Sequence, residues 1–336
     1  MSKILIIGAG WYGCHLALRL SQLGHHVRLL EKNNEIFTGA SFYNQNRLHL
    51  GFHYPRSSLT RAQSKRGCRL FKIHYPTLIS PIDLNIYAIP HYDSFMDFKT
   101  YCDIMTSSGL DWDDVTDCLP ISLANIEGAL ACDEFVIQRN KAKEYFQFEL
   151  KDIITLDYPI SKKECTSLSV EYDLVLDCTW NHLFKSNQFF YEPCIVFIYR
   201  HTLHVKLALT LMDGSLFSLF PLDGDLYTLT HVKYTPLGKF PDSIAALRRI
   251  EELDQVEIDQ LKSHTENHVS SFYPGFHSSF EYAGYYTSVK TKQQNALNDA
   301  RNTFMSNVSD NIYGIHSGKI DTIFDIEHQI VRLLRD

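Results

Sequence analysis

The sequence predicts an α/β fold in which a mainly parallel sheet is joined to a second, α+β lobe built on an antiparallel sheet. Three observations lead to this prediction. A short β-branched apolar run opens the chain and continues into a glycine-rich turn and an amphipathic helix. A second strand–glycine–helix unit stands near the C-terminal end. Between them, alternating apolar residues flank Asp-Gly turns, a pattern typical of β-hairpins.

The opening unit is Rossmann-like. Residues 3–8 read K-I-L-I-I-G, as expected for a strand that is buried on both faces. A G-x-G-x-x-G turn follows, formed by Gly8, Gly10, Trp11, Tyr12 and Gly13. In such a turn the glycines permit a tight bend, the approach of a pyrophosphate and close packing of the next helix. The N–H groups of that helix favour phosphate, so the unit predicts a dinucleotide site.

An acidic residue follows the second predicted strand, residues 26–30. Glu31 can accept hydrogen bonds from both ribose hydroxyls of a dinucleotide, and Lys32 lies beside it. A carboxylate here disfavours the 2′-phosphate of NADP. The motif by itself leaves FAD and NAD open.

The composition is that of an ordinary globular protein, with 45% hydrophobic and 21% charged residues. A formal net charge of -7 argues against nucleic acid as a partner. The eight cysteines form no C-x-x-C, which favours reduced thiols and a cytoplasmic location. The N-terminal apolar run is a short strand that ends at Gly8, so we expect no signal peptide. The most apolar stretch, residues 194–212, is interrupted by Arg200, His201, His204 and Lys206, so we expect no membrane span. The oligomeric state stays open.

Three further segments carry a family resemblance. Residues 38–56 read T-G-A-S-F-Y-N-Q-N-R-L-H-L-G-F-H-Y-P-R, and residues 171–180 read E-Y-D-L-V-L-D-C-T-W. Residues 311–326 read N-I-Y-G-I-H-S-G-K-I-D-T-I-F-D-I. With these segments in this order after the opening motif, the chain resembles the D-amino-acid oxidase superfamily of FAD-dependent oxidoreductases, which includes the glycine and sarcosine oxidases. The resemblance implies FAD as the cofactor.

The resemblance also implies which residues lie near FAD. The first segment would wrap the pyrophosphate and flavin, the second would end a strand beside the cofactor, and the third would point a helix N-terminus at the flavin. The implied contacts are Ser41, Asn46, Arg47, Leu48, Thr179, Gly318, Lys319 and Ile320. One residue departs from the family pattern, because Trp180 stands where a glycine is expected.

These segments make the FAD-binding domain discontinuous, with expected boundaries of 1–80, 131–190 and 290–336. Residues 81–130 and 191–289 would then form the substrate domain. Its antiparallel sheet is indicated by the turns Asp213-Gly214 and Asp223-Gly224, each flanked by apolar residues. In the family that this chain resembles, such a sheet covers the flavin.

The chemistry implied by the resemblance is hydride transfer to flavin, usually from a carbon that bears nitrogen. As catalytic candidates we take His49 and His53, which can act as bases, and Arg56, which can hold a carboxylate or phosphate. An equally weighted interpretation is that these side chains only contact the cofactor or cap their loop. The candidate substrate contacts are Tyr54, His231, Tyr285 and Arg301.

His49 and His53 also have the spacing of a helical metal pair. Gly51 and Pro55 argue against a helix there, and neither a cysteine nor an acid completes the set, so we expect no metal. His49 is also a candidate for a covalent link to the flavin.

Three functions stay open. The first is an FAD-dependent oxidoreductase that transfers a hydride from a small amine, amino acid or amino sugar. The second is a non-oxidative flavoenzyme of the mutase type that acts on a nucleotide sugar in surface polysaccharide biosynthesis. The third is a binding protein that keeps the fold and has lost catalysis, which the tryptophan at position 180 suggests.

Overall fold

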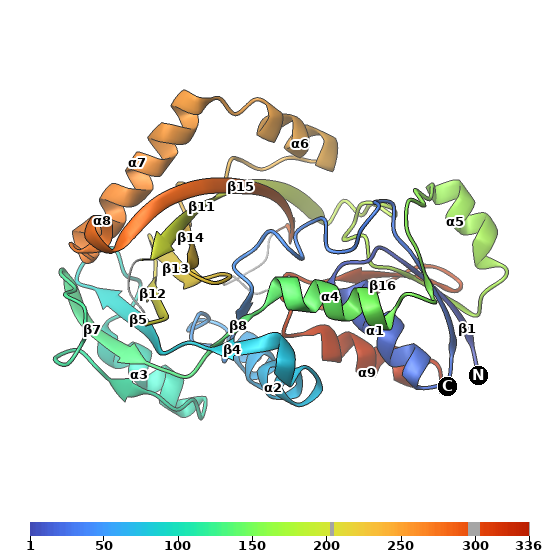
Figure 1. Ribbon diagram of the computed structural model, residues 1–336. Coiled ribbons are helices and arrows are strands. Elements are labelled where there is room, and N and C mark those ends of the chain that lie inside the picture. The colour runs from blue at the N-terminus through green and yellow to red at the C-terminus, as the bar shows by residue number, and fades with distance from the viewer. Residues whose placement is uncertain (202–204, 295–302, 336) are drawn as a thin grey trace.

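The computed structural model describes residues 1–201, 205–294 and 303–335 (Figure 1). Its strands form two large sheets and one small sheet. The predicted residue Arg301 lies outside the described residues. Within them, no helix combines the length and the apolar character that crossing a membrane would require.

The first sheet has six strands in the order β16-β17-β10-β1-β2-β9. Its strands are β1 (Lys3–Ile7), β2 (His26–Leu30), β9 (Ile154–Thr155), β10 (Leu174–Asp177), β16 (Phe304–Ser309) and β17 (Ile312–His316). All neighbours pair in parallel except β16 and β17. The central strand β1 is apolar throughout its buried part because helices cover both faces of the sheet. This confirms the predicted parallel sheet.

Helices α1 (Trp11–Gln22), α4 (Arg139–Glu149) and α9 (Ile323–Leu333) pack together on one face of this sheet. Helix α5 (Lys162–Ser169) covers the other face through Cys165. Helix α2 (Ser58–His74) packs on α9, so the C-terminal helix lies between two N-terminal ones (Figure 1). The ends of the chain therefore form one core.

The second sheet has eight strands in the order β15-β11-β14-β13-β12-β5-β7-β6. Its strands are β5 (Leu84–Pro90), β6 (Asp113–Asp114), β7 (Ile126–Ala131), β11 (Phe189–His201), β12 (Leu207–Leu211), β13 (Phe217–Pro221), β14 (Leu226–His231) and β15 (Phe280–Gln293). Every pairing is antiparallel except that of β12 with β5. The two Asp-Gly turns join β12 to β13 and β13 to β14, which confirms the predicted hairpins.

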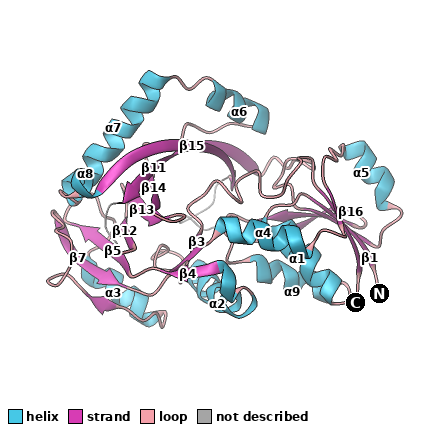
Figure 2. Cartoon of the chain, viewed as in Figure 1, coloured by secondary structure: helices cyan, strands magenta, loops and turns pink. Residues whose placement is uncertain are grey.

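Helices α6 (Ser243–Glu251), α7 (Gln255–Phe272) and α8 (Phe276–Ser279) lie on the outer side of the strongly curved strand β15 (Figure 2). Helix α3 (Phe98–Ser107) packs near β7. A small sheet stands between the two large ones. It contains β3 (Arg47–Leu48), β4 (Ile79–Pro81) and β8 (Phe135–Ile137), with the short 3-10 helix η1 (Pro76–Leu78) beside it.

The second sheet has two different faces. Its helix face, which packs on α7 and α8, carries Phe197, Leu219 and Leu229. Its inner face carries Ser218 and Thr228, which alternate with them along the strands. The inner face meets the N-terminal loop, because the side chain of Gln45 donates to the Ser218 carbonyl (3.1 Å) and to Thr228 Oγ1 (3.1 Å). The loop of residues 41–56 is therefore held between the two large sheets.

We expect Gly67→Ala to destabilise the protein, although alanine in a helix interior is normally more favourable than glycine by about 1 kcal/mol. A Cβ atom at Gly67 would lie 1.9 Å from the backbone oxygen of Asp321, so α2 and the segment before α9 must separate. Overpacking of this kind costs about 1–3 kcal/mol. Thermal unfolding should show a lower Tm for this variant. Arg69→Ala, on the exposed side of the same helix, is the matched control; an unchanged or higher Tm for Gly67→Ala would contradict the packing.

Candidate functional site

The glycine-rich turn between β1 and α1 is packed too closely for side chains. A Cβ atom at Gly13 would lie 1.8 Å from the Gly8 carbonyl oxygen, and one at Gly10 would lie 2.7 Å from Ser41 Oγ. Gly8 has φ +96°, a conformation that glycine adopts readily. Helix α1 has no side-chain cap and no acid in its first turn, so its N-terminus offers a positive end to an anion. The turn fits a pyrophosphate.

The carboxylate of Glu31 is held at the end of β2. Its Oε2 accepts from the backbone N–H of Ala9 (2.7 Å), and its Oε1 accepts from the backbone N–H (3.0 Å) and side-chain amide (2.9 Å) of Asn33. The acid is thereby fixed beside the glycine-rich turn, where a ribose would lie. Lys32 is exposed next to it. The set of residues therefore fits an adenine dinucleotide such as FAD.

Trp11 and Ser41 connect this turn to the next segment. The backbone N–H of Trp11 donates to Ser41 Oγ (3.0 Å). The indole of Trp11 is buried against Phe37, Phe71 and Phe146, with ring centroids 5.1–5.5 Å apart. The side chain of Trp11 thus belongs to the core, and only its backbone faces the turn.

Arg47 is buried at the centre of the molecule. Its Nη1 donates to Ser218 Oγ (2.9 Å), and its Nε lies 3.8 Å from Glu134 Oε2. The guanidinium stacks over the ring of Phe220 (4.2 Å) and lies near that of Tyr87 (5.4 Å). The neighbouring residues Asn46 and Leu48 are also buried. These three side chains therefore fix the loop between the sheets.

Glu134, which the sequence analysis did not single out, completes this cluster. Its carboxylate accepts from the backbone N–H of Leu50 (2.9 Å), from Tyr87 Oη (2.8 Å) and from Asn85 Nδ2 (3.3 Å). Burial raises its pKa, and the charge of Arg47 opposes that rise. The only signal in the sequence is an acid directly before the apolar run of β8.

His49, His53 and Tyr54 form a cluster of rings. Their centroids are 5.5–5.7 Å apart, and His53 also faces Tyr87 at 6.5 Å. The ammonium of Lys319 lies 5.2 Å from the centroid of the Tyr54 ring. The structure thus brings these predicted residues together, although they come from opposite ends of the chain.

Arg56 lies apart from that ring cluster, against the turn between β12 and β13. Its Nη2 is 3.3 Å from Asp213 Oδ1, and its guanidinium stacks over the ring of Phe95 (4.9 Å). The Arg56 side chain is 36% exposed, whereas that of Asp213 is only 2% exposed. Arg56 is therefore committed to a buried carboxylate of the protein itself.

The C-terminal turn before α9 is tied to the glycine-rich turn. The hydroxyl of Tyr12 donates to the Lys319 carbonyl (2.8 Å) and contacts Thr322 Oγ1 (2.9 Å). Burial raises the pKa of Tyr12, so this hydroxyl stays protonated. Gly318 is exposed and Ile320 is half-buried at the same turn. The tie joins residues 307 positions apart in the sequence.

The segment after β10 passes the same turn. A Cβ atom at Gly8 would lie 3.0 Å from the Cys178 carbonyl oxygen. Asp177 Oδ1 accepts from the N–H (2.9 Å) and the hydroxyl (2.6 Å) of Thr179. Trp180 then adopts φ +57°, a left-handed conformation that favours glycine. The tryptophan in place of the family's glycine is therefore accommodated with backbone strain.

Two predicted substrate residues are not brought to the ring cluster. His231 lies on the helix face of the second sheet, where its Nε2 is 3.1 Å from Nδ1 of His268 on α7. Tyr285 lies on the same face and is 43% exposed. Its neighbour Tyr286 takes the inner face and donates to the Asn44 carbonyl (2.8 Å). The alternation of a strand decides between such neighbours, and the sequence does not show the parity.

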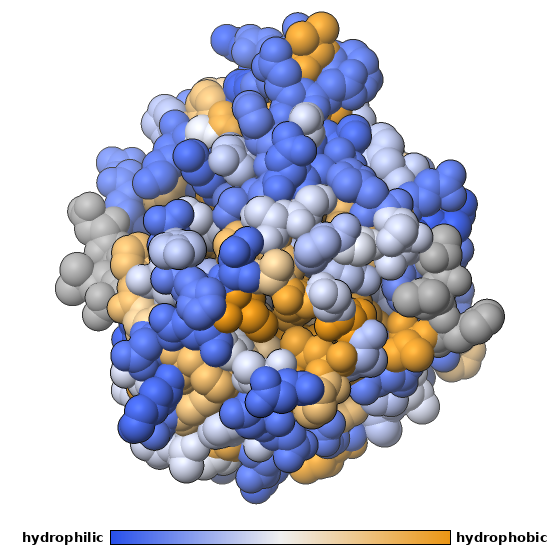
Figure 3. Space-filling view, turned by 90° about the vertical axis from the view of Figure 1, so that its left-hand side faces the viewer, coloured by the Kyte–Doolittle hydropathy of each residue, from blue (hydrophilic) through white to orange (hydrophobic). Residues whose placement is uncertain are grey.

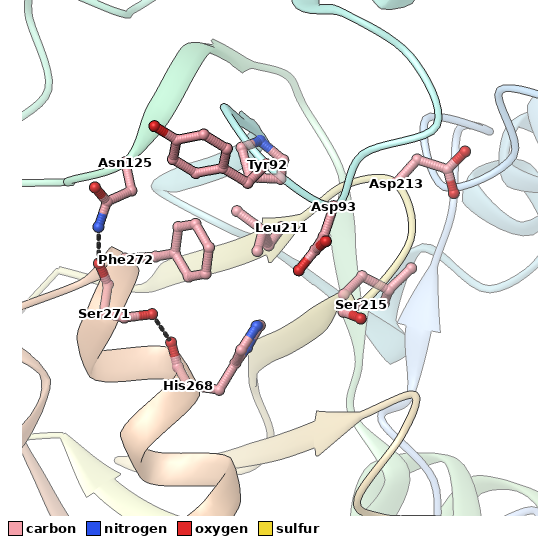
Figure 4. A pocket seen from close by; sticks show the side chains of 11 residues that line it. Tyr92, Asp93, Asn125, Leu211, Asp213, Ser215, His268, Ser271 and Phe272 are labelled. Atoms are coloured by element: carbon pink, nitrogen blue, oxygen red, sulfur yellow. Dashed lines mark hydrogen bonds between the residues drawn. The ribbon is translucent and has the colours of Figure 1, made fainter.

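A cavity of about 330 Å³ adjoins the Arg56–Asp213 pair. It is lined by Pro90, Tyr92, Asp93, Asn125, Leu211, Asp213, Ser215, Leu216, His268, Ser271 and Phe272. Figure 3 views the molecule from the end of the second sheet where α3, β7 and α8 lie in Figure 1, and it shows apolar residues gathered near the middle of the surface that faces the viewer. Figure 4 shows the side chains of Asp93 and His268 directed into the cavity. Among the described residues, no group of three or more His, Cys, Asp and Glu side chains could hold a metal ion.

Comparisons with known proteins agree with this geometry. The family described as "FAD dependent oxidoreductase" matches residues 3–102. An FAD-dependent monooxygenase of Fusarium mangiferae is 36% identical, over 98% of this chain and 90% of its own length. The FAD-dependent monooxygenase kojA of Aspergillus flavus is 27% identical, over 99% of this chain and 86% of its own.

Solved structures share the fold at low sequence identity. Glycine oxidase from Geobacillus kaustophilus superposes with a TM-score of 0.75 at 11% identity, covering 99% of this chain and 94% of its own. L-alpha-glycerophosphate oxidase from Mycoplasma pneumoniae, with FAD bound, superposes with a TM-score of 0.72 at 15% identity, covering 100% of this chain and 95% of its own. These likenesses confirm the predicted fold class.

We expect Gly13→Ala to weaken FAD binding at least tenfold, because the new methyl group would push α1 away from β1 and displace the N–H groups that face the pyrophosphate. FAD retained on the purified protein, and the Kd on reconstitution, measure this. Gln22→Ala, at the exposed C-terminal end of the same helix, is the control. Equal FAD affinity of the Gly13→Ala and wild-type proteins would contradict the assignment.

We expect the pair of His231 and His268 to make folding stability depend on pH. Burial, with the charges of His268 and Lys233, lowers the pKa of His231 from 6.5 to about 3. The folded state then binds fewer protons than the unfolded state below pH 6.5, so stability falls as the pH drops from about 6.5 toward 3. The Tm of His231→Gln should fall less steeply over this range than that of the wild type. The exposed His277→Gln is the control, and parallel slopes for all three proteins would refute the expectation.

Proposed function

This chain belongs to the family of FAD-dependent oxidoreductases, and we propose that it transfers a hydride from a small amine, amino acid or amino sugar to the flavin. The observation that carries the proposal is the contact of Tyr12 with Lys319 and Thr322. It ties the C-terminal turn to the glycine-rich turn, and the family resemblance implies that this C-terminal turn would lie beside the flavin. That arrangement supports a flavin ring rather than a nicotinamide.

The residues of the first lobe would hold FAD. The backbone of Gly8–Gly13 would contact the pyrophosphate, Glu31 the ribose, and Ser41 the adjoining phosphate. Residues 317–322 would approach the flavin, and the first turn of α9, which carries Asp325, follows directly after them. FAD, when bound, supplies a two-electron acceptor that takes a hydride from the substrate carbon and leaves an imine.

The second lobe and the 41–56 loop would form the substrate side of the site. His49 and His53 are the candidate bases, because an imidazole can take the proton of a substrate ammonium near neutral pH. Arg47 and Glu134 hold the loop that bears them, through the backbone N–H of Leu50. Neither of these two buried side chains needs to contact substrate to act in this way.

A second candidate function is monooxygenation, which the two fungal relatives favour. In that reaction a reduced nicotinamide nucleotide would supply the electrons, and one oxygen atom of O₂ would enter the substrate. The two functions differ in which compound reduces the flavin.

We expect amines, added anaerobically to the FAD-loaded protein, to bleach its visible absorption without NADH or NADPH. His49→Gln or His53→Gln should slow this reduction about 10²–10⁴-fold, because a positioned base contributes that much. His277→Gln, on the surface, should keep the wild-type rate. Reduction by NADPH alone, with ¹⁸O from O₂ in the product, would replace this proposal with the monooxygenase function.

A further inference from the structure

Trp180 follows a strand whose carboxyl end lies beside the glycine-rich turn. Strand β10 pairs in parallel with β1, and Asp177 stands opposite Ile7 in this pairing. A Cβ atom at Gly8 would lie 3.3 Å from the backbone nitrogen of Thr179. Ligands of open α/β sheets bind outside the carboxyl ends of the strands, so Trp180 lies at the edge where the dinucleotide would bind.

The backbone at Trp180 is held in a conformation that suits glycine better. Trp180 has φ +57° and Asn181 has φ +67°, both in the left-handed region. The Asp177 carboxylate fixes the segment by accepting from the backbone N–H of Phe184 (3.1 Å). The carbonyl of Trp180 accepts from Thr291 Oγ1 on β15 (3.2 Å). Strain of this kind persists only where surrounding contacts hold it, and it is frequent at ligand sites.

The indole of Trp180 is not used by the core of the first lobe. Cys178 before it and Phe184 after it pack in the apolar clusters on the two faces of the sheet, whereas Trp180 is only half-buried. Among the described residues, the indole belongs to neither cluster and packs on no other aromatic ring. Trp11, by contrast, is 2% exposed and packs on three rings. A contact with a bound ligand would give the Trp180 indole a partner.

The segment after this tryptophan turns toward the end of β2. Leu183 packs in the same apolar cluster as Leu30, the last residue of that strand. Desolvation, together with the positive charge of Lys32, lowers the pKa of His182 to about 4, so the two side chains lie close enough to interact. Glu31, directly before that lysine, is the carboxylate that fits the ribose of the adenosine half. The indole therefore stands on the adenosine side of the site.

We propose that the indole of Trp180 packs on the adenosine half of bound FAD, at a position where the family that this chain resembles has a glycine. The proposal goes beyond the hydride transfer proposed above and does not depend on the substrate. An aromatic ring that stacks on a nucleobase strengthens binding about tenfold to hundredfold. Such a contact gives a reason for a bulky residue at a strained backbone position.

The test uses ADP, which carries the adenosine half without the flavin. Titration calorimetry of the protein freed of FAD gives the Kd of ADP and of FAD. Trp180→Ala should weaken both ligands by the same factor, at least tenfold, and Trp180→Phe should restore most of the affinity because it keeps a ring. Trp112→Ala is the control and should keep both wild-type Kd values, since the Trp112 indole donates to Thr106 Oγ1 of α3 in the second lobe.

Trp180→Gly separates a ligand contact from a structural role. Glycine adopts the left-handed conformation readily, so the Tm of the FAD-free protein should rise, whereas its affinity for ADP should fall as in Trp180→Ala. Tryptophan emission gives a second measurement, because ADP does not absorb at the emission wavelength. ADP should change the emission of the wild type and of Trp112→Phe, but not that of Trp180→Phe.

Wild-type affinity for ADP in Trp180→Ala would overturn the proposal, and so would a loss of FAD affinity without a loss of ADP affinity. Absence of ADP binding by the wild type would overturn it as well. A lower Tm for Trp180→Gly than for the wild type would also contradict it, because the indole would then stabilise the protein itself. All these results are distinct from the bleaching by amines, which tests hydride transfer.

Discussion

The structure depends on one buried ion pair between its two large sheets. Arg47 and Glu134 are removed from water, which is costly for isolated charges. The Glu134 carboxylate accepts from Leu50, Tyr87 and Asn85, and Arg47 Nη1 donates to Ser218. Ser218 comes from the second sheet, and Leu50 comes from the loop that carries the candidate bases. Loss of one partner would leave the other charge buried alone, at about 3–5 kcal/mol. The position of the loop, and with it the distance between cofactor and substrate residues, follows from this pair.

The two lobes differ in the charged groups that they present. The first lobe presents to the anionic cofactor the N-terminus of α1, whose first turn contains no acidic residue. On the side of the second lobe, Arg47 lies beside Glu134 and Arg56 beside Asp213. The fold is shared with glycine oxidase at 11% identity, so the substrate is set by side chains of the site and not by the fold.

Local patterns were sufficient to predict the unit from β1 to β2, because its glycines and apolar residues act within about 30 residues of one another. The hairpins after β12 and β13 were predicted for the same reason. The role of Glu134 could not be predicted from local patterns, because its partners Leu50 and Asn85 are 84 and 49 positions away in the sequence. Tyr285 and His231 lie on the helix face of the second sheet and not on its inner face. A shift of one residue along a strand moves a side chain to the opposite face, and the periodicity of the sequence does not show which face is turned to the cofactor. Arg56 stays a prediction as a substrate contact, and the structure adds its partner Asp213, which lies 157 positions away in the sequence.

The central claim is that the glycine-rich turn, the 41–56 loop and the C-terminal turn together hold FAD. The most direct test is the visible absorption spectrum of the purified protein, repeated on the supernatant after acid precipitation. The account predicts a flavin spectrum that passes into the supernatant as FAD. Flavin that stays with the pellet would still place FAD at this site and would indicate a covalent link, with His49 as the first residue to examine. A colourless protein that FAD does not reconstitute would contradict the account.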